Sequence, residues 1–205
     1  MHLEAIPKEN KSVFLSLANF SDFYLAGGTA LALQIGHRIS VDFDLFSDQD
    51  ISEDLLLKVK NTFQDDKVIV SVNNPDELTV FVNQTKLTFL KYPFSVISDF
   101  SAYQNLKLLN IKEIAAAKAY TIGRRGAYKD YIDLYYIIFD QFSNLDEIIE
   151  IAEKKYKDEF NSRLFLEQLI YLDDITDEKI IFLKDKIDKD SLKIFFEERI
   201  KEIKL

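Results

Sequence analysis

Hydrophobic residues in the first half of the chain follow the periods of short strands and short helices. A run of apolar residues at 23–26 predicts a strand that ends at Gly27 and Gly28. The next segment, "ALALQIG", predicts a brief helix that Thr29 caps and Gly36 ends. The pattern therefore places a glycine turn directly between a strand and a helix.

Polar and apolar residues alternate strictly in the following segment, "VDFDLF". Successive side chains of a strand point to opposite faces, so this alternation predicts a strand with Asp42 and Asp44 together on one face. The apolar side chains expected on the other face are Val41, Phe43 and Leu45.

A helix over 52–65 is predicted next, with Ser52 as its N-cap and acidic residues in its first turn. Three strands follow, at 67–72, 78–82 and 86–92, joined by the polar segments "NNPDE" and "NQ". Because these connections are short, we expect the three strands to form an antiparallel meander.

From about residue 110 the apolar residues recur at three- and four-residue spacing, which predicts helices. The helices are expected at 111–125, 128–140, 145–157, 161–172, 177–187 and 190–203. The sequence therefore predicts an α+β protein, with a mixed sheet core over 1–105 and a helical region over 106–205.

The composition excludes several classes of protein. The chain has 205 residues, 47% of them hydrophobic, which is enough to fill a core. It has no cysteine, so disulfides and thiolate metal sites are excluded and a reducing compartment is favoured. No apolar run approaches the roughly 20 residues of a membrane span, and the N-terminal segment has no apolar signal core. We expect a soluble protein of the cytoplasm with no membrane partner.

The charge balance argues against a protein that coats nucleic acid. The chain has 26 basic and 35 acidic residues, a formal charge of −9, whereas bulk binding to nucleic acid needs a basic face. A local basic cluster can still contact a few phosphates. The cluster within 118–129 consists of Lys118, Arg124, Arg125 and Lys129.

A glycine turn beside two aspartates is the arrangement that phosphoryl transfer uses. Such a site binds divalent cations with carboxylates and phosphates with backbone N–H groups. Asp42 and Asp44 on one strand face can share metal ions, and Gly27 and Gly28 let the backbone approach a phosphate closely. The helix after the turn offers its N-terminal amides to an anion. An ordinary turn and a solvated acidic face remain the simpler alternatives for each part alone.

The order of strand, glycine turn, helix and Asp-x-Asp strand resembles the first motif of the polymerase-β-like nucleotidyltransferases. More narrowly, "LAGGTALALQIGHRISVDFDLFS" resembles the signature of the AbiEii/AbiGii toxin family. A second segment, "KEIAAAKAYTIGRRGAYKDYIDLYYII", is similar to the later motif of that family, and "TKLTFLKYPFSVI" to its third-strand segment. The resemblance covers roughly residues 20–140.

The resemblance implies the activity. A nucleotidyltransferase core, completed by the helical region, would transfer a nucleotidyl group from a nucleoside triphosphate (NTP) to an acceptor hydroxyl. The implied acceptor is RNA, with a tRNA end as the leading candidate. The implied setting is an abortive-infection or toxin–antitoxin system, with the chain as the toxin and a cognate antitoxin as a candidate partner.

The resemblance also implies the roles of individual residues. Asp42 and Asp44 would bind magnesium, with manganese as a second candidate ion. Lys118 would face the phosphates, and either Asp130 or Asp133 would supply a late acidic position. The residues assigned to the reaction are Asp42, Asp44, Lys118 and Asp130, and those assigned to substrate binding are Gly27, Gly28, Thr29, Arg38, Arg124 and Lys129.

Each of these assignments has a structural alternative. Lys118 could be a surface lysine with its stem along apolar neighbours, and Lys129 could form an i,i+4 pair with Asp133. Asp130 stands in a first helical turn, where the helix dipole alone favours a carboxylate, and Arg124 stands near a helix C-terminus, where it favours a cation.

The sequence departs from the polymerase-β pattern at one position. Those enzymes carry a third carboxylate on a neighbouring strand, and the position that aligns with it here is Thr88. There is no acidic residue at all between Leu78 and Ser98. The general base would then be a substrate group, a water molecule or an acid such as Asp130.

Two other functions are compatible with these motifs. A catalytically silent module would keep the fold and bind nucleotide, having lost turnover with the acid at Thr88. A glycosyltransferase could hold a nucleotide sugar and a metal ion at the Asp-x-Asp pair. The second is disfavoured, because barely forty residues precede the pair, whereas glycosyltransferases place an αβα half of ~100 residues before it.

Overall fold

The computed structural model of the chain describes residues 1–203 and divides into two compact units. The sheet unit comprises Met1–Ser95 and Asp99–Leu109. The helical unit comprises Val96–Ser98 and the chain from Asn110 onward. The short segment 96–98 therefore belongs to the helical unit, although residues of the sheet unit flank it on both sides.

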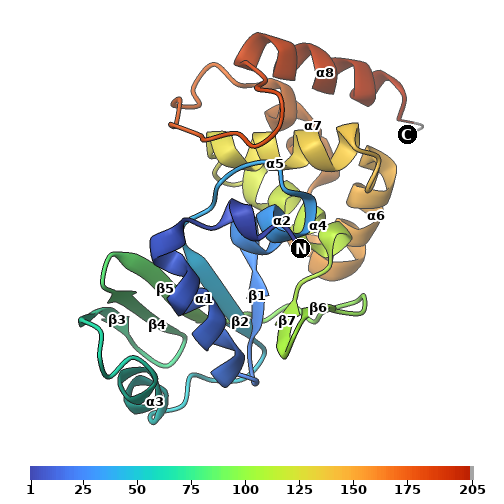
Figure 1. Cartoon of the computed structure of the whole chain (residues 1–205). Coiled ribbons are helices and arrows are strands. Elements are labelled where there is room, and N and C mark those ends of the chain that lie inside the picture. The colour runs from blue at the N-terminus through green and yellow to red at the C-terminus, as the bar shows by residue number, and fades with distance from the viewer. Residues whose placement is uncertain (204–205) are drawn as a thin grey trace. The chain divides into compact units, whose positions relative to one another are not determined.

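The sheet unit is built on one mixed sheet of seven strands (Figure 1). Their order is β3-β4-β5-β2-β1-β7-β6. The β2–β5 and β1–β7 pairs are parallel and the other pairs are antiparallel. The strands are β1 (Tyr24–Ala26), β2 (Phe43–Ser47), β3 (Val68–Asn73), β4 (Glu77–Val82), β5 (Thr85–Lys91), β6 (Ser101–Tyr103) and β7 (Leu106–Leu108). This mixed sheet confirms the predicted α+β class.

Three α-helices accompany the sheet: α1 (Lys11–Ser16), α2 (Gly27–Ile35) and α3 (Leu55–Thr62). Helix α2 ends as predicted, because Gly36 takes the left-handed conformation at its C-cap with φ of 63°. Two cap predictions are wrong. The N-cap of α2 is Ala26, not Thr29, and that of α3 is Asp54, not Ser52.

Strand β2 has the two faces that its alternating sequence predicts. Phe43 and Leu45 are fully buried, whereas Asp44 is half-buried on the opposite face. The prediction fails at Val41, which is 49% exposed because the strand begins only at Phe43.

Aromatic side chains of α1, the turn after it and the end of α3 cover the apolar face of the sheet. Phe14 stacks on Phe43 with ring centroids 6.1 Å apart, and Phe20 meets Phe89 edge-on at 4.9 Å. Phe20 also stacks on Phe63, which follows α3. Burying such large rings stabilises the sheet unit and leaves the opposite face of β2 and β5 to carry the polar side chains.

The predicted meander is present: β3, β4 and β5 are consecutive antiparallel neighbours. Strands β6 and β7 were not predicted from the sequence. They are three residues long each and pair through Ser101–Leu108 and Tyr103–Leu106. Strand β7 also pairs with β1 in parallel, so residues that directly precede the helical unit extend the sheet.

The helical unit contains five α-helices within its described residues (Figure 1). They are α4 (Ile111–Ile122), α5 (Tyr128–Phe139), α6 (Leu145–Tyr156), α7 (Ser162–Ile170) and α8 (Lys189–Lys201). Asn110, Asn144, Asn161 and Asp188 cap four of them, each accepting a hydrogen bond from a first-turn N–H.

The prediction of a helix at 177–187 is wrong, because this segment is irregular. Its backbone oxygens accept hydrogen bonds from tyrosines of α5 instead: Tyr136 donates to Asp185 and Tyr128 to Ile187. Lys184 pairs with Asp140 just after α5, at 2.6 Å. Because side chains of α5 already donate hydrogen bonds to these carbonyl groups, forming a helix within the segment would satisfy fewer unpaired backbone groups.

A buried ion pair joins three segments of the helical unit. Glu113 of α4 and Lys155 of α6 are 2.5 Å apart, and neither side chain is exposed. The other carboxylate oxygen of Glu113 accepts hydrogen bonds from the backbone N–H groups of Ile97 and Ser98. The carboxylate therefore anchors the segment 96–98 to the helices.

Buried tyrosines make the stability of the helical unit sensitive to alkaline pH. Burial raises the pKa of Tyr131 and of Tyr136 to about 12. Above pH 10 the unfolded chain releases these protons and the folded chain retains them, so unfolding becomes more favourable as the pH rises. We expect the free energy of unfolding to be unaffected by these groups below pH 10 and to fall between pH 10 and about 12.

Urea unfolding at about pH 9 and about pH 11 measures this loss. The Tyr131→Phe variant is the control, because it lacks one of the two phenols and should lose less stability over the same interval. Equal losses in the variant and the wild type would contradict the assignment to Tyr131.

Within residues 1–203, no helix combines the length and the apolar character needed to cross a membrane.

Candidate active site

Asp44 lies against the glycine turn. In the β1–β2 pair Asp44 is opposite Ala26, the residue that precedes Gly27. A Cβ atom built on Gly27 would lie 2.9 Å from Oδ2 of Asp44, and Gly27 has a positive φ of 65°. Both observations require glycine here. The carboxylate therefore sits beside the backbone that begins α2, which is where a helix offers N–H groups to an anion.

Asp42 precedes β2, yet its backbone is fixed from two sides. The Thr29 hydroxyl bonds to the carbonyl oxygen of Asp42 and lies 2.7 Å from the Ser40 hydroxyl. The side-chain amide of Asn10 donates to the carbonyl oxygen of Val41 at 2.8 Å. Thr29 is almost fully buried, so its side chain holds the backbone at Asp42 in place. Its backbone N–H stands in the first turn of α2.

The register of the sheet aligns a row of short polar side chains with Asp44. Asp44 pairs with Thr88 across β2 and β5, and Thr88 pairs with Thr79 across β5 and β4. Paired residues project from the same face of a sheet. Thr88 is therefore the neighbour of Asp44 at the position where the sequence pattern expected a third carboxylate.

In the helical unit, Lys118 is held between two carboxylates. Its ammonium lies 2.5 Å from Asp130 and 2.7 Å from Asp133, and all three side chains are nearly or fully buried. The alternative of a solvated surface lysine is thereby contradicted. Asp133 pairs with Lys118 rather than with Lys129, the partner considered from the i,i+4 spacing.

The remaining predicted cations have different surroundings. Arg38 is buried and donates to the backbone oxygen of Ile39 at 3.1 Å. Arg124 lies over the Tyr120 ring at 4.1 Å and donates to the backbone of Glu159. Lys129 is exposed at the start of α5. His37, which follows α2, is fully buried.

The donor set fits a magnesium ion that shares its ligands with a substrate. Among residues 1–203, no three His, Cys, Asp or Glu side chains are grouped to hold a metal ion. Magnesium in nucleotide sites commonly takes one or two protein carboxylates and completes its shell with phosphate and water oxygens. Asp42 and Asp44 would supply that number, and the glycine turn beside Asp44 would receive the phosphates.

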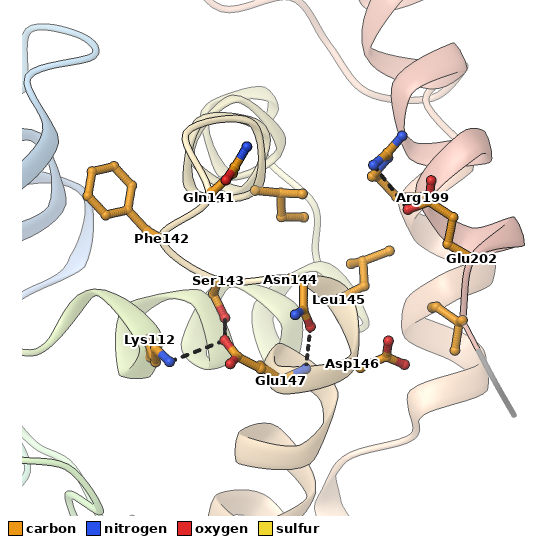
Figure 2. Close-up of a pocket in the computed structure, with 12 residues that line it drawn as sticks. Lys112, Gln141, Phe142, Ser143, Asn144, Leu145, Asp146, Glu147, Arg199 and Glu202 are labelled. Atoms are coloured by element: carbon orange, nitrogen blue, oxygen red, sulfur yellow. Dashed lines mark hydrogen bonds and ion pairs between the residues drawn. The ribbon is translucent and has the colours of Figure 1, made fainter.

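A separate hollow of about 440 Å³ lies within the helical unit (Figure 2). Four of its charged side chains form two pairs: Lys112 lies 3.2 Å from Glu147, and Arg199 lies 3.0 Å from Glu202. Hydrogen bonds from Ser143 and Lys112 lower the pKa of Glu147. None of the predicted site residues lines this hollow, and its paired charges are those of a structural ion-pair network.

The sequence interpretation missed two polar residues on the sheet face that carries Asp44 and Thr88. Thr79 and Glu77 of β4 continue the polar row, with the Thr79 hydroxyl 2.6 Å from Oε1 of Glu77. The alternation of "ELTVFV" puts both side chains on one face. Only the pairing register, which links Thr79 to Thr88 and Thr88 to Asp44, could have placed them on the Asp44 face of the sheet.

A family model decides the relationship. The model for the nucleotidyl transferase AbiEii toxin of type IV toxin–antitoxin systems matches residues 15–204. The chain belongs to the AbiEii family. The match confirms the resemblance that was based on the glycine turn and the Asp-x-Asp strand. It also extends the resemblance from roughly residues 20–140 to residues 15–204.

Individual proteins resemble this chain over most of its length. An uncharacterized protein of Aquifex aeolicus is 28% identical over 190 residues, covering 92% of this chain and 91% of its own. The crystal structure of a Helicobacter pylori protein described as a nucleotidyltransferase has a TM-score of 0.58 at 18% identity, covering 98% of this chain and 95% of that one. That of Helicobacter pylori JHP933 has a TM-score of 0.53 at 13% identity, covering 96% of each chain. These structures show that the fold is that of the nucleotidyltransferases.

Proposed function

We propose that this AbiEii-family protein transfers a nucleotidyl group from an NTP to an acceptor hydroxyl, with magnesium as the metal and manganese as a substitute. The observation that carries the proposal is the Asp44 carboxylate lying against Gly27 at the start of α2. This contact brings a metal-binding group and a phosphate-binding backbone together. Bound magnesium would supply charge neutralisation at the triphosphate.

The residues of the sheet unit bind and orient the triphosphate. Asp42 and Asp44 hold the metal, and the backbone at Gly27, Gly28 and Thr29 receives the phosphates. Thr29 also fixes the Asp42 backbone through its hydroxyl. One residue therefore links the aspartates proposed for the metal to the turn proposed for the phosphates. Such prior positioning is the main protein contribution to phosphoryl transfer.

The helical unit contributes the family's later motif. We assign Lys118 to the phosphates, with Asp130 and Asp133 fixing its ammonium by contacts of 2.5 and 2.7 Å. Arg38, Arg124 and Lys129 are assigned to substrate contacts on the family motif. The two carboxylates fix the orientation of the Lys118 ammonium, as the role of a phosphate-binding cation requires.

We propose RNA, and a tRNA end first, as the acceptor. Aromatic rings lie on the Asp44 side of the sheet: Phe46, two residues along β2, stacks on Tyr92 with centroids 4.8 Å apart and meets Tyr24 edge-on at 6.2 Å. Unpaired RNA bases stack on such rings. A cognate antitoxin and a cytoplasmic setting complete the proposal.

A silent nucleotide-binding module is the second candidate. The register that places Thr88 beside Asp44 favours it, because a threonine brings no charge to the metal and cannot act as a base at neutral pH. In this case the protein would bind NTP with magnesium and transfer nothing.

Mass spectrometry of RNA after incubation with each of the four NTPs separates the two candidates. We expect a mass increase of one or more nucleotides on tRNA with at least one NTP, dependent on magnesium. Calorimetric binding of NTP without any added mass would support the silent module. Absence of both binding and transfer would contradict both candidates.

A further inference from the structure

Thr88 is the end of a chain of polar contacts that runs across two strands to Glu77. Its hydroxyl lies 3.4 Å from the hydroxyl of Thr79, and that hydroxyl lies 2.6 Å from Oε1 of Glu77. Thr88 is paired with Asp44 on its other side. The chain of contacts therefore leads from a half-buried carboxylate to the neighbour of the metal-binding aspartate.

The donors and acceptors of this chain have only one consistent direction. A carboxylate only accepts, and each hydroxyl has a single hydrogen to donate. The 2.6 Å contact therefore uses the hydrogen of Thr79. Since Thr79 has no second hydrogen, the 3.4 Å contact between the two hydroxyls is a hydrogen bond only with Thr88 as the donor and Thr79 as the acceptor. The Thr88 oxygen then has only lone pairs left to offer to a group on the Asp44 side.

Burial favours this direction of the hydrogen bonds. Thr79 is 3% exposed and Thr88 is 8% exposed, so little water can compete for either hydrogen. Hydrogen bonds in such surroundings polarise one another. Glu77 is half-buried, which places the carboxylate at the wetter end of the chain and the acceptor oxygen at the end beside Asp44.

We propose that Glu77 and Thr79 are positioning residues that make Thr88 a fixed hydrogen-bond acceptor for the attacking hydroxyl of the acceptor substrate. The inference rests on the proposed function. Thr88 orients the nucleophile and takes no proton from it. Its neutral oxygen would orient the attacking hydroxyl as the third carboxylate does in polymerase-β-like enzymes, but without a negative charge. This assignment gives Thr88 a role in turnover rather than a role in its loss.

Kinetics with the accepting RNA tests the positioning role. Thr79→Val removes the acceptor for the Thr88 hydrogen, so we expect kcat to fall ~5-fold, the size of one neutral hydrogen bond, with KM for NTP unchanged. Thr79→Ser and Glu77→Gln should each retain the activity of the wild type, because a hydroxyl and an amide oxygen preserve the hydrogen bonds between residues 77, 79 and 88. Glu77→Ala combined with Thr79→Val should cost no more than either alone.

The control is Thr85→Val. Thr85 is a buried threonine on β5, three residues from Thr88 and on the opposite face of the strand. The same chemical change there should leave kcat unchanged. A loss in this variant comparable to that of Thr79→Val would overturn the proposal, because it would show that loss of a buried threonine hydroxyl elsewhere in the sheet has the same effect.

The direction of the hydrogen bonds is measured without any turnover. Proton NMR should show slowly exchanging hydroxyl protons for Thr79 and Thr88, with the Thr79 proton oriented toward Glu77 and that of Thr88 toward Thr79. The opposite orientation, or an unchanged kcat in Thr79→Val, would overturn the positioning role while leaving the proposed function in place. Failure of the wild type to modify any RNA would overturn the proposed function, and the role of Thr88 in turnover with it.

Discussion

Replacing Asp44 by asparagine is expected to reduce nucleotidyl transfer about 1,000-fold, because loss of a metal-binding charge removes several kcal/mol of transition-state stabilisation. Asparagine keeps the shape of the side chain, so it still fits against Gly27, where a Cβ would approach Asp44 to 2.9 Å. The loss would therefore report on charge. The measurements are the rate of label transfer from NTP to RNA and the affinity for NTP with magnesium by calorimetry.

The matched control is Asp48→Asn. Asp48 follows β2 directly and is exposed, and the amide of Gln49 donates to it at 2.9 Å. The same change of charge at this position should leave transfer within about 2-fold of the wild type, as expected of a surface substitution. If Asp44→Asn transferred nucleotides as fast as Asp48→Asn, the proposed metal site would be wrong.

Replacing Glu113 by alanine is expected to lower the free energy of unfolding of the helical unit by about 3–5 kcal/mol, the usual cost of removing one member of a buried ion pair. The substitution deprives the Lys155 ammonium of a carboxylate at 2.5 Å, where neither side chain is exposed. It also removes the acceptor for the backbone N–H groups of Ile97 and Ser98. Urea unfolding followed by circular dichroism measures the change.

Two further variants separate charge from packing. Glu113→Leu combined with Lys155→Met removes both charges and should be less destabilising than Glu113→Ala. Lys112→Met breaks the Lys112–Glu147 pair, which joins the same two helices at 3.2 Å but is nearly half exposed, and should cost less than about 1 kcal/mol. Equal costs for Lys112→Met and Glu113→Ala would show that burial of the pair has no effect on its contribution.

The local elements of the sheet unit follow from its sequence. The alternation of "VDFDLF" is sufficient for a strand with Asp44 opposite two buried apolar side chains, and Gly36 is sufficient for the end of α2. In both cases the responsible interactions lie within a few residues, so the period of the side chains and the freedom of glycine determine the outcome. The short connections of the meander act in the same local way.

Where the sequence interpretation failed, distant residues compete with local preferences. The segment 177–187 has helical spacing but is irregular, because tyrosines of α5 bind its carbonyl groups. Helix α2 begins at Gly27, so Thr29 lies inside its first turn. The Thr29 hydroxyl bonds to the carbonyl oxygen of Asp42, thirteen residues further along the chain, instead of capping the helix.

The sequence by itself determined the family, the glycine turn and the aspartate pair, because these depend on residue type and close spacing. The tertiary structure alone decided which side chains accompany them. The register of β2, β5 and β4 brings Thr88 and Thr79 into line with Asp44, and Glu77 joins this row through its contact with Thr79. Helix packing gives Lys118 two carboxylates instead of solvent. Register and packing are set by contacts between residues far apart in the chain. The spacing of residues within one segment does not determine these contacts.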